Sequence, residues 1–106
     1  MELSHLKDMI GGWIVGDFEP SILKSKDCEV AVKRYKAGDS EQQHFHKIAQ
    51  ELTLIVAGRV KMFNKEFTDG DIVLIKPGEV TGFLSITDSI TVVVKKPSII
   101  GDKYFI

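Results

Sequence analysis

The feature that most constrains the fold is a series of short β-type segments, separated by turn signals, in the middle of the chain. Candidate strands cover Cys28–Lys36, Leu52–Ala57, the hairpin Arg59–Phe67, Ile72–Ile75 and Ser89–Lys96. The first alternates in polarity, the hairpin turns near Asn64 and Lys65, and Asp69-Gly70 marks a further turn. Short strands separated by turns predict an all-β barrel or sandwich.

Composition narrows the class of protein. The chain has 106 residues, enough for one domain whose core needs no disulfide or structural metal. Its 14 Lys and Arg nearly balance its 15 Asp and Glu, which argues against nucleic acid and anionic membrane as partners. The single cysteine, Cys28, excludes an internal disulfide, and no segment resembles a secretion signal or membrane span. These properties predict a cytoplasmic protein.

We divide the single domain, residues 1–106, into an N-terminal arm (1–27), a barrel core (28–96) and a C-terminal tail (97–106). Apolar residues recur at helical spacing in the arm, at Leu3, Leu6, Met9 and Ile10. Because glycines follow directly, one short helix is predicted there. The tail ends in Tyr104, Phe105 and Ile106, which are hard to leave in water. We expect the tail to cover a sheet edge or a second subunit.

A possible metal site lies just before the predicted strand Leu52–Ala57, where a further strand would carry two histidines. His44 and His46 stand two residues apart, which directs both imidazoles to the same face of a strand. Glu51 opens the next strand, so pairing of the two strands can bring its carboxylate to the imidazoles. Two imidazoles and one carboxylate form a facial triad that suits iron, manganese, zinc or nickel and leaves positions for water or substrate. Alternatively, all three are surface polar groups, as many histidines on solvated strands are.

The residues around this triad have a regular spacing, Gly-x5-His-x-His-x4-Glu-x6-Gly, over Gly38–Gly58. This segment resembles the first motif of the cupin superfamily. Residues 70–83, GDIVLIKPGEVTGF, resemble the second motif, Gly-x5-Pro-x-Gly-x2-His, with two departures. Lys76 replaces the proline, with Pro77 beside it, and Thr81 replaces the final histidine.

The resemblance covers about residues 28 to 96 and implies a double-stranded β-helix, the cupin jelly roll, with a metal inside the barrel. It implies that His44, His46 and Glu51 are three of the usual four ligands. Thr81 is a poor fourth, because a hydroxyl is a much weaker donor than imidazole. Three outcomes stay open: a three-ligand centre with extra water, a weak site filled only at high metal, or a degenerate pocket that uses hydrogen bonds. Family habit also implies a homodimer.

Two classes of function fit these residues, so whether the protein is an enzyme is left open. The first is a metal-dependent isomerase, lyase or dioxygenase acting on a small polar molecule, and the resemblance implies a sugar derivative. Tyr35 and Gln42 are then the candidate catalytic residues for proton transfer. The second class binds a small ligand without turnover, which the missing histidine favours. Further polar candidates are Lys33, Glu79 and Thr81, and the cluster Lys33, Arg34 and Lys36 suits either an anionic substrate or a solvated strand face.

Overall fold

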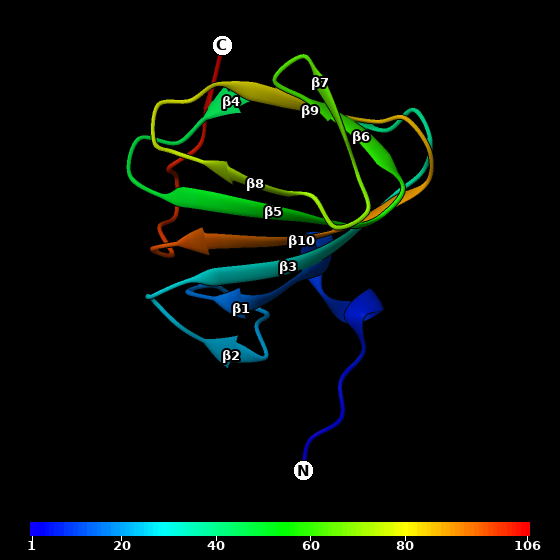
Figure 1. Cartoon of the computed structure of the whole chain (residues 1–106). Coiled ribbons are helices and arrows are strands. Elements are labelled where there is room, and N and C mark those ends of the chain that lie inside the picture. The colour runs from blue at the N-terminus through cyan, green and yellow to red at the C-terminus, as the bar shows by residue number, and fades with distance from the viewer.

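Eleven short strands form two sheets in this computed structural model, which describes residues 1–106. One sheet has the order β2 (Leu23–Lys24), β1 (Trp13–Gly16), β3 (Glu29–Tyr35), β10 (Ser89–Lys96), β5 (Gln50–Ala57) and β8 (Ile72–Ile75). The other has the order β11 (Tyr104–Phe105), β4 (Ser40–Phe45), β9 (Thr81–Ser85), β6 (Arg59–Met62) and β7 (Lys65–Thr68). The second sheet arches over one side of the first (Figure 1). The predicted all-β barrel is confirmed.

Strand β10 sets the inward and outward faces of the larger sheet. Val93 pairs with Ala31 of β3 and with Thr53 of β5, and all three side chains are buried. Their sequence neighbours point to the outer face, because successive side chains of a strand alternate. The predicted alternation in β3 is therefore confirmed. The hydrophobic core lies between the sheets and consists of Ile55, Val60, Met62, Ile75 and Phe83.

Two tight turns close the barrel in the way the sequence requires. The β6–β7 hairpin turns at Phe63 and Asn64, whose φ angles of 50° and 59° are those of a two-residue type I′ turn. This is within one residue of the predicted turn. Gly58, between β5 and β6, has φ 94°, and a Cβ there would lie 2.3 Å from the Asp88 carbonyl oxygen. Only glycine fits this position.

The N-terminal arm forms no continuous helix. It contains two separate 3₁₀ turns, η1 (Leu6–Asp8) and η2 (Ile10–Gly12). The prediction of one continuous short helix is therefore wrong. Helices this short are marginal unless an apolar face is packed, and Leu3 is 90% exposed. Gly11 at φ 60° also breaks the helical path. None of the helical segments has the length and apolarity needed to cross a membrane.

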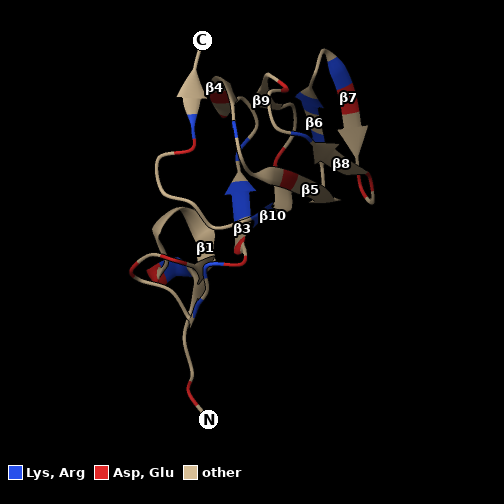
Figure 2. Cartoon of the chain, turned by 90° about the vertical axis from the view of Figure 1, so that its left-hand side faces the viewer, with Lys and Arg blue, Asp and Glu red and all other residues tan.

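The C-terminal tail covers an edge of the smaller sheet. Tyr104 and Phe105 pair as β11 with Phe45 and His44 of β4, as Figure 2 shows for the chain end beside β4. This confirms the sheet-edge alternative predicted for the tail. Basic and acidic residues are interspersed along the strands and loops (Figure 2), in agreement with the balanced charge. The homodimer stays a prediction.

Candidate metal and ligand site

A cavity of about 360 Å³ lies between the two sheets. Its lining includes His44 from β4, His46 from the β4–β5 loop, Glu51 from β5, Tyr35 from β3 and Thr81 from β9. The fold thus brings the three predicted metal ligands into one space, although β4 and β5 do not pair as predicted and instead lie in opposite sheets. A cavity of this size accommodates a small molecule.

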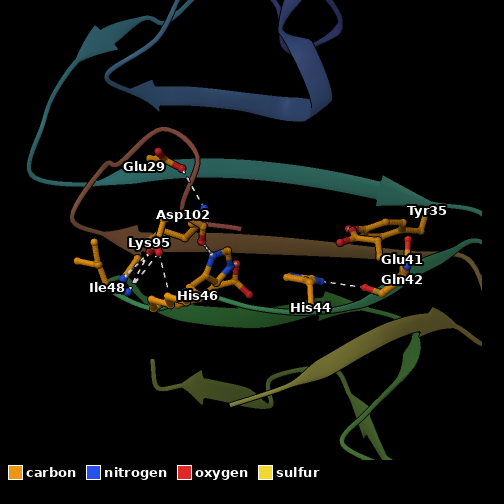
Figure 3. Close-up of polar contacts among 12 residues, drawn as sticks. Glu29, Tyr35, Glu41, Gln42, His44, His46, Ile48, Lys95 and Asp102 are labelled. Carbon is orange, nitrogen blue, oxygen red and sulfur yellow. Dashed lines mark hydrogen bonds and ion pairs between the residues drawn. The ribbon is translucent and has the colours of Figure 1, made fainter. Parts of the chain in front are cut away.

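Both imidazoles are held so that the same ring nitrogen faces away from the protein backbone. His46 Nδ1 donates a hydrogen bond to the backbone carbonyl of Asp102, and His44 Nδ1 donates to the carbonyl of Gln42 at 2.9 Å (Figure 3). A carbonyl oxygen only accepts, so the hydrogen of each neutral ring is on Nδ1. The Nε2 lone pairs are then left for a metal ion, which is the arrangement that metal-binding histidines usually show.

The Nε2 atom of His46 has no hydrogen-bond partner although it is buried. It lies 3.7 Å from Glu51 Oε1, and the His44 and His46 ring centroids are 5.4 Å apart. A buried polar atom without a protein partner is uncommon in native proteins, and such an atom often marks a place where an ion or a water molecule binds. No three His, Cys, Asp or Glu side chains are close enough together to hold an ion. Metal binding by this set therefore requires a side-chain movement.

The His46–Glu51 pair shifts the pKa of both groups. The Glu51 carboxylate raises the pKa of His46 above its usual 6.5, against the opposing effect of burial. Burial by itself would raise the pKa of Glu51. The interactions with His46 and Lys95 outweigh this effect and hold the pKa of Glu51 below the usual 4.5. Glu51 is therefore ionised at neutral pH, as a metal ligand must be.

These shifts predict how the stability of the metal-free protein depends on pH. Because the pKa of His46 is raised, its contribution is complete below pH 6.5 and is lost as pH rises through the raised pKa. Because the pKa of Glu51 is lowered, its contribution is complete above pH 4.5 and is lost as pH falls through the lowered pKa. The urea midpoint of the metal-free protein should gain most from the pair between these values. Glu51→Gln should flatten this dependence, and an unchanged profile would contradict the pairing.

Thr81 lines the cavity at the position of the missing histidine, directly opposite His44 on the paired strands. Its hydroxyl accepts a hydrogen bond from the Phe63 amide at 3.0 Å and donates one to the Gly82 carbonyl at 2.8 Å. The hydroxyl is thus already engaged with the backbone. Thr81 holds the β6–β7 turn and is not suited to bind a metal.

Replacing Thr81 by histidine should supply the missing imidazole. We expect Thr81→His to tighten metal binding by about tenfold, because imidazole is a far better donor than hydroxyl. The loss of the Phe63 contact should cost about 1 kcal/mol of stability. Competition with a chromophoric chelator measures the first effect and urea unfolding the second. Metal affinity equal to or below that of the natural protein would show that position 81 does not point at the ion.

Tyr35 forms a second polar pair in the cavity. Its hydroxyl donates a short hydrogen bond to the Glu41 carboxylate, and its ring packs against Phe83 with centroids 4.4 Å apart. Burial, and then the neighbouring Glu41, raise the pKa of Tyr35 well above its usual value. The phenol stays protonated, so it can donate a hydrogen bond but cannot act as a base. Glu41, which the regular alternation of the strand did not single out, is the acceptor of this pair.

Gln42, predicted as a catalytic residue, does not lie on the strand face that His44 presents to the cavity. Glu41 pairs with Phe83 and His44 with Thr81, so three residue steps on β4 face two on β9. This β-bulge inserts an extra residue and inverts the alternation. Glu41 and His44 therefore both line the cavity, whereas Gln42 is exposed and contributes only its backbone carbonyl to His44.

The other polar candidates differ in whether their side chains line the cavity or face solvent. Lys33 lines the cavity, whereas Arg34 and Lys36 are exposed, so the predicted basic cluster is divided between two faces. Glu79 is exposed and accepts a hydrogen bond from the Lys76 amide at 2.7 Å, within a turn outside the cavity. Of these residues, only Lys33 can contact a ligand in the cavity.

Asp102 is a residue of the site that no pattern in the sequence indicates. It is only 4% exposed, and its carboxylate accepts hydrogen bonds from the amides of Lys47, Ile48 and Ala49. These residues form the loop that follows His46 (Figure 3). Burial by itself would raise the pKa of Asp102. The hydrogen bonds from the three amides outweigh this effect and lower the pKa of Asp102. Asp102 thus fixes the loop through its side chain and the His46 ring through its carbonyl.

Comparison with known proteins supports the fold. No protein-family model matches this sequence, and no curated protein matches it. A solved structure of an uncharacterized conserved protein with a double-stranded β-helix domain from Klebsiella pneumoniae is 24% identical, with a TM-score of 0.72, over 78% of this chain and 73% of its own. An RmlC-like cupin from Shewanella frigidimarina is 19% identical, with a TM-score of 0.62, over 69% of this chain and 68% of its own. This chain has the cupin fold.

Cupin-fold structures that match this chain include enzymes of several reaction types. One is oxalate decarboxylase from Bacillus subtilis, which has Mn(II) centres. It is 16% identical, with a TM-score of 0.65, over 77% of this chain and 25% of its own. At these identities the likeness shows the fold and leaves the activity of this cupin-fold chain to be argued from its own residues.

Proposed function

We propose that the protein binds a divalent transition metal through His44, His46 and Glu51 and acts on a small polar molecule in the same cavity. The observation that carries the proposal is the buried Nε2 atom of His46, which has no partner and lies 3.7 Å from Glu51 Oε1. Hydrogen bonds from Nδ1 to backbone carbonyls prepare both rings for the same purpose. Iron, manganese, zinc and nickel all suit two imidazoles and a carboxylate.

The remaining cavity residues support a catalytic role. A bound metal supplies Lewis acidity that polarises a carbonyl or hydroxyl oxygen. When a substrate oxygen replaces Glu41 as the acceptor of the single Tyr35 hydroxyl hydrogen, the freed Glu41 carboxylate can accept a proton. With Thr81 engaged elsewhere, only three protein ligands remain, so the site has room for substrate. We propose isomerase, lyase or dioxygenase chemistry, with a sugar derivative as one candidate substrate.

A non-catalytic cupin-fold protein that only binds a small ligand is the second candidate. The absence of a fourth ligand at Thr81 favours it, because weaker metal retention follows from fewer ligands. The Tyr35–Glu41 pair favours the enzyme, since a mere binding protein needs no proton donor beside a proton acceptor.

Elemental analysis of the untagged protein, purified without chelators, tests the metal half of the proposal. Near-stoichiometric iron, manganese, zinc or nickel supports it and selects the chemistry for substrate screens. No metal, even after incubation with each of these four ions and desalting, contradicts it and leaves the ligand-binding candidate.

A further inference from the structure

Thr91 has an unexplained hydroxyl in the wall of the cavity. The structure contains only two buried side-chain polar atoms without a hydrogen-bond partner, Nε2 of His46 and Oγ1 of Thr91. Both residues line the same cavity. Thr91 is 1% exposed, and a hydroxyl left unpaired at that depth destabilises a fold. A metal explains His46 but not Thr91, because Thr91 of β10 is outside the proposed ligand set and a hydroxyl is a weak metal donor.

The ammonium group of Lys33 has no carboxylate partner in the cavity. Three of the four carboxylates that line the cavity lie in an ion pair, Glu19 with Lys24, Glu29 with Lys95 and Glu51 with His46, whereas Glu41 accepts from the neutral Tyr35 hydroxyl and keeps its charge. Lys33 and Lys103 also line the cavity, but neither forms an ion pair. Lys33 is therefore a cation of the lining with no carboxylate partner, and it is free to meet an anionic group of a ligand.

Lys33 is placed to hold such a ligand. Its ammonium lies 5.2 Å from the centre of the Trp13 ring, which also lines the cavity. Lys95 lies over the same ring at 5.7 Å, but its charge is compensated by Glu29 at 3.4 Å. Lys33 and Thr91 stand directly opposite each other on the paired strands β3 and β10. Their side chains leave neighbouring positions of one wall.

We infer that Lys33 and Thr91 form a carboxylate subsite, so that the ligand of the cavity is a small hydroxylated organic acid. Lys33 meets the carboxylate charge, and the Thr91 hydroxyl bonds to a carboxylate or hydroxyl oxygen beside it. A single ammonium and one hydroxyl are few donors for a phosphate, which usually gathers several amides or guanidinium groups. The inference rests on the proposal that the cavity binds a small molecule, but not on the presence of metal.

Titration of the metal-free protein with L-malate tests the charge requirement. Malamide is the matched neutral probe, because it keeps the hydroxyl and the size, and inorganic phosphate is the second anion. Ligand-observed NMR should show malate binding at least about tenfold tighter than malamide and tighter than phosphate. Lys33→Met should abolish this preference. Lys36→Met, which removes an exposed lysine near the end of the same strand, should keep it.

Thr91→Val separates a ligand contact from a structural role. This substitution keeps the shape and removes an unpartnered hydroxyl, so the melting temperature should stay equal or rise while malate affinity falls by about fivefold. Thr81→Val is the matched control, because that hydroxyl accepts the Phe63 amide and its removal should lower the melting temperature.

Four results with malate would overturn the inference. The natural protein could bind malate and malamide with equal affinity, or fail to bind malate up to about 10 mM, which is above the affinity range of ordinary ligands. Lys33→Met could bind malate as the natural protein does. Thr91→Val could lose stability while its malate binding stays unchanged. Tighter phosphate than malate binding identifies a phosphate site and also contradicts it. The titration uses the metal-free protein, so its result does not depend on metal binding. If the protein binds malate but never binds metal, only the proposed metal centre is refuted.

Discussion

Replacing both His44 and His46 by alanine should remove bound metal from the protein while the barrel remains folded. Both rings present Nε2 to the cavity, and Glu51 alone is a weak monodentate ligand. We expect metal affinity to fall by more than about a hundredfold, since changes even at residues behind the ligands cost ten- to a hundredfold. Elemental analysis and chelator competition measure the loss, and circular dichroism measures the fold.

His5→Ala is the matched control, because His5 is exposed in the N-terminal arm and does not line the cavity. Its metal content should equal that of the natural protein. If the double variant keeps its metal, the ligands have been assigned wrongly. If its circular dichroism spectrum is lost as well, His44→Ala alone, at the less buried ring, gives the answer without disturbing the hydrogen bond to Asp102.

Replacing Asp102 by alanine should have the second largest effect and should act on stability and metal affinity together. The side chain is the acceptor for three loop amides that are otherwise left without partners. We expect the free energy of unfolding to fall by about 2–4 kcal/mol, because the buried Ala49 amide and two partly buried amides lose a charged acceptor. We expect metal affinity to fall by about ten- to a hundredfold, because the backbone carbonyl of residue 102 remains but is no longer held in place against the His46 ring.

Asp102→Asn refines this prediction. The amide oxygen can still accept from part of the loop, so both losses should be smaller than with alanine. Asp71→Asn is the control, since Asp71 accepts from Thr68 in an exposed turn and should change stability slightly and metal affinity not at all. Urea unfolding and chelator competition give the two readouts. A loss of stability with unchanged metal affinity would refute the link between Asp102 and the site.

Six of the eleven strands, β3, β5 to β8 and β10, could be predicted from the sequence because their patterns are local. Alternation in β3 and the β-branched run in β10 follow from side chains that face the core on one side of the sheet. His44, His46 and Glu51 do line one cavity, but the predicted pairing of their strands is wrong: β4 and β5 lie in different sheets, and the cavity between the sheets brings the three side chains together.

The remainder of the site depends on features that alternation does not encode. The bulge in β4 exchanges Gln42 for Glu41 on the inner face, and a bulge has no periodic signal. Asp102 lies 56 residues from His46, and only the return of the tail beside β4 brings them together. The orphan hydroxyl of Thr91 can be recognised only when the contacts of its whole environment are known.

The most direct test of the central claim is a crystal structure of the protein loaded with manganese or zinc, with anomalous diffraction recorded at the edge of that metal. The structure predicts one anomalous peak inside the barrel, bonded to Nε2 of His44, Nε2 of His46 and a carboxylate oxygen of Glu51. A peak on other residues, or no peak inside the barrel at saturating metal, would contradict it.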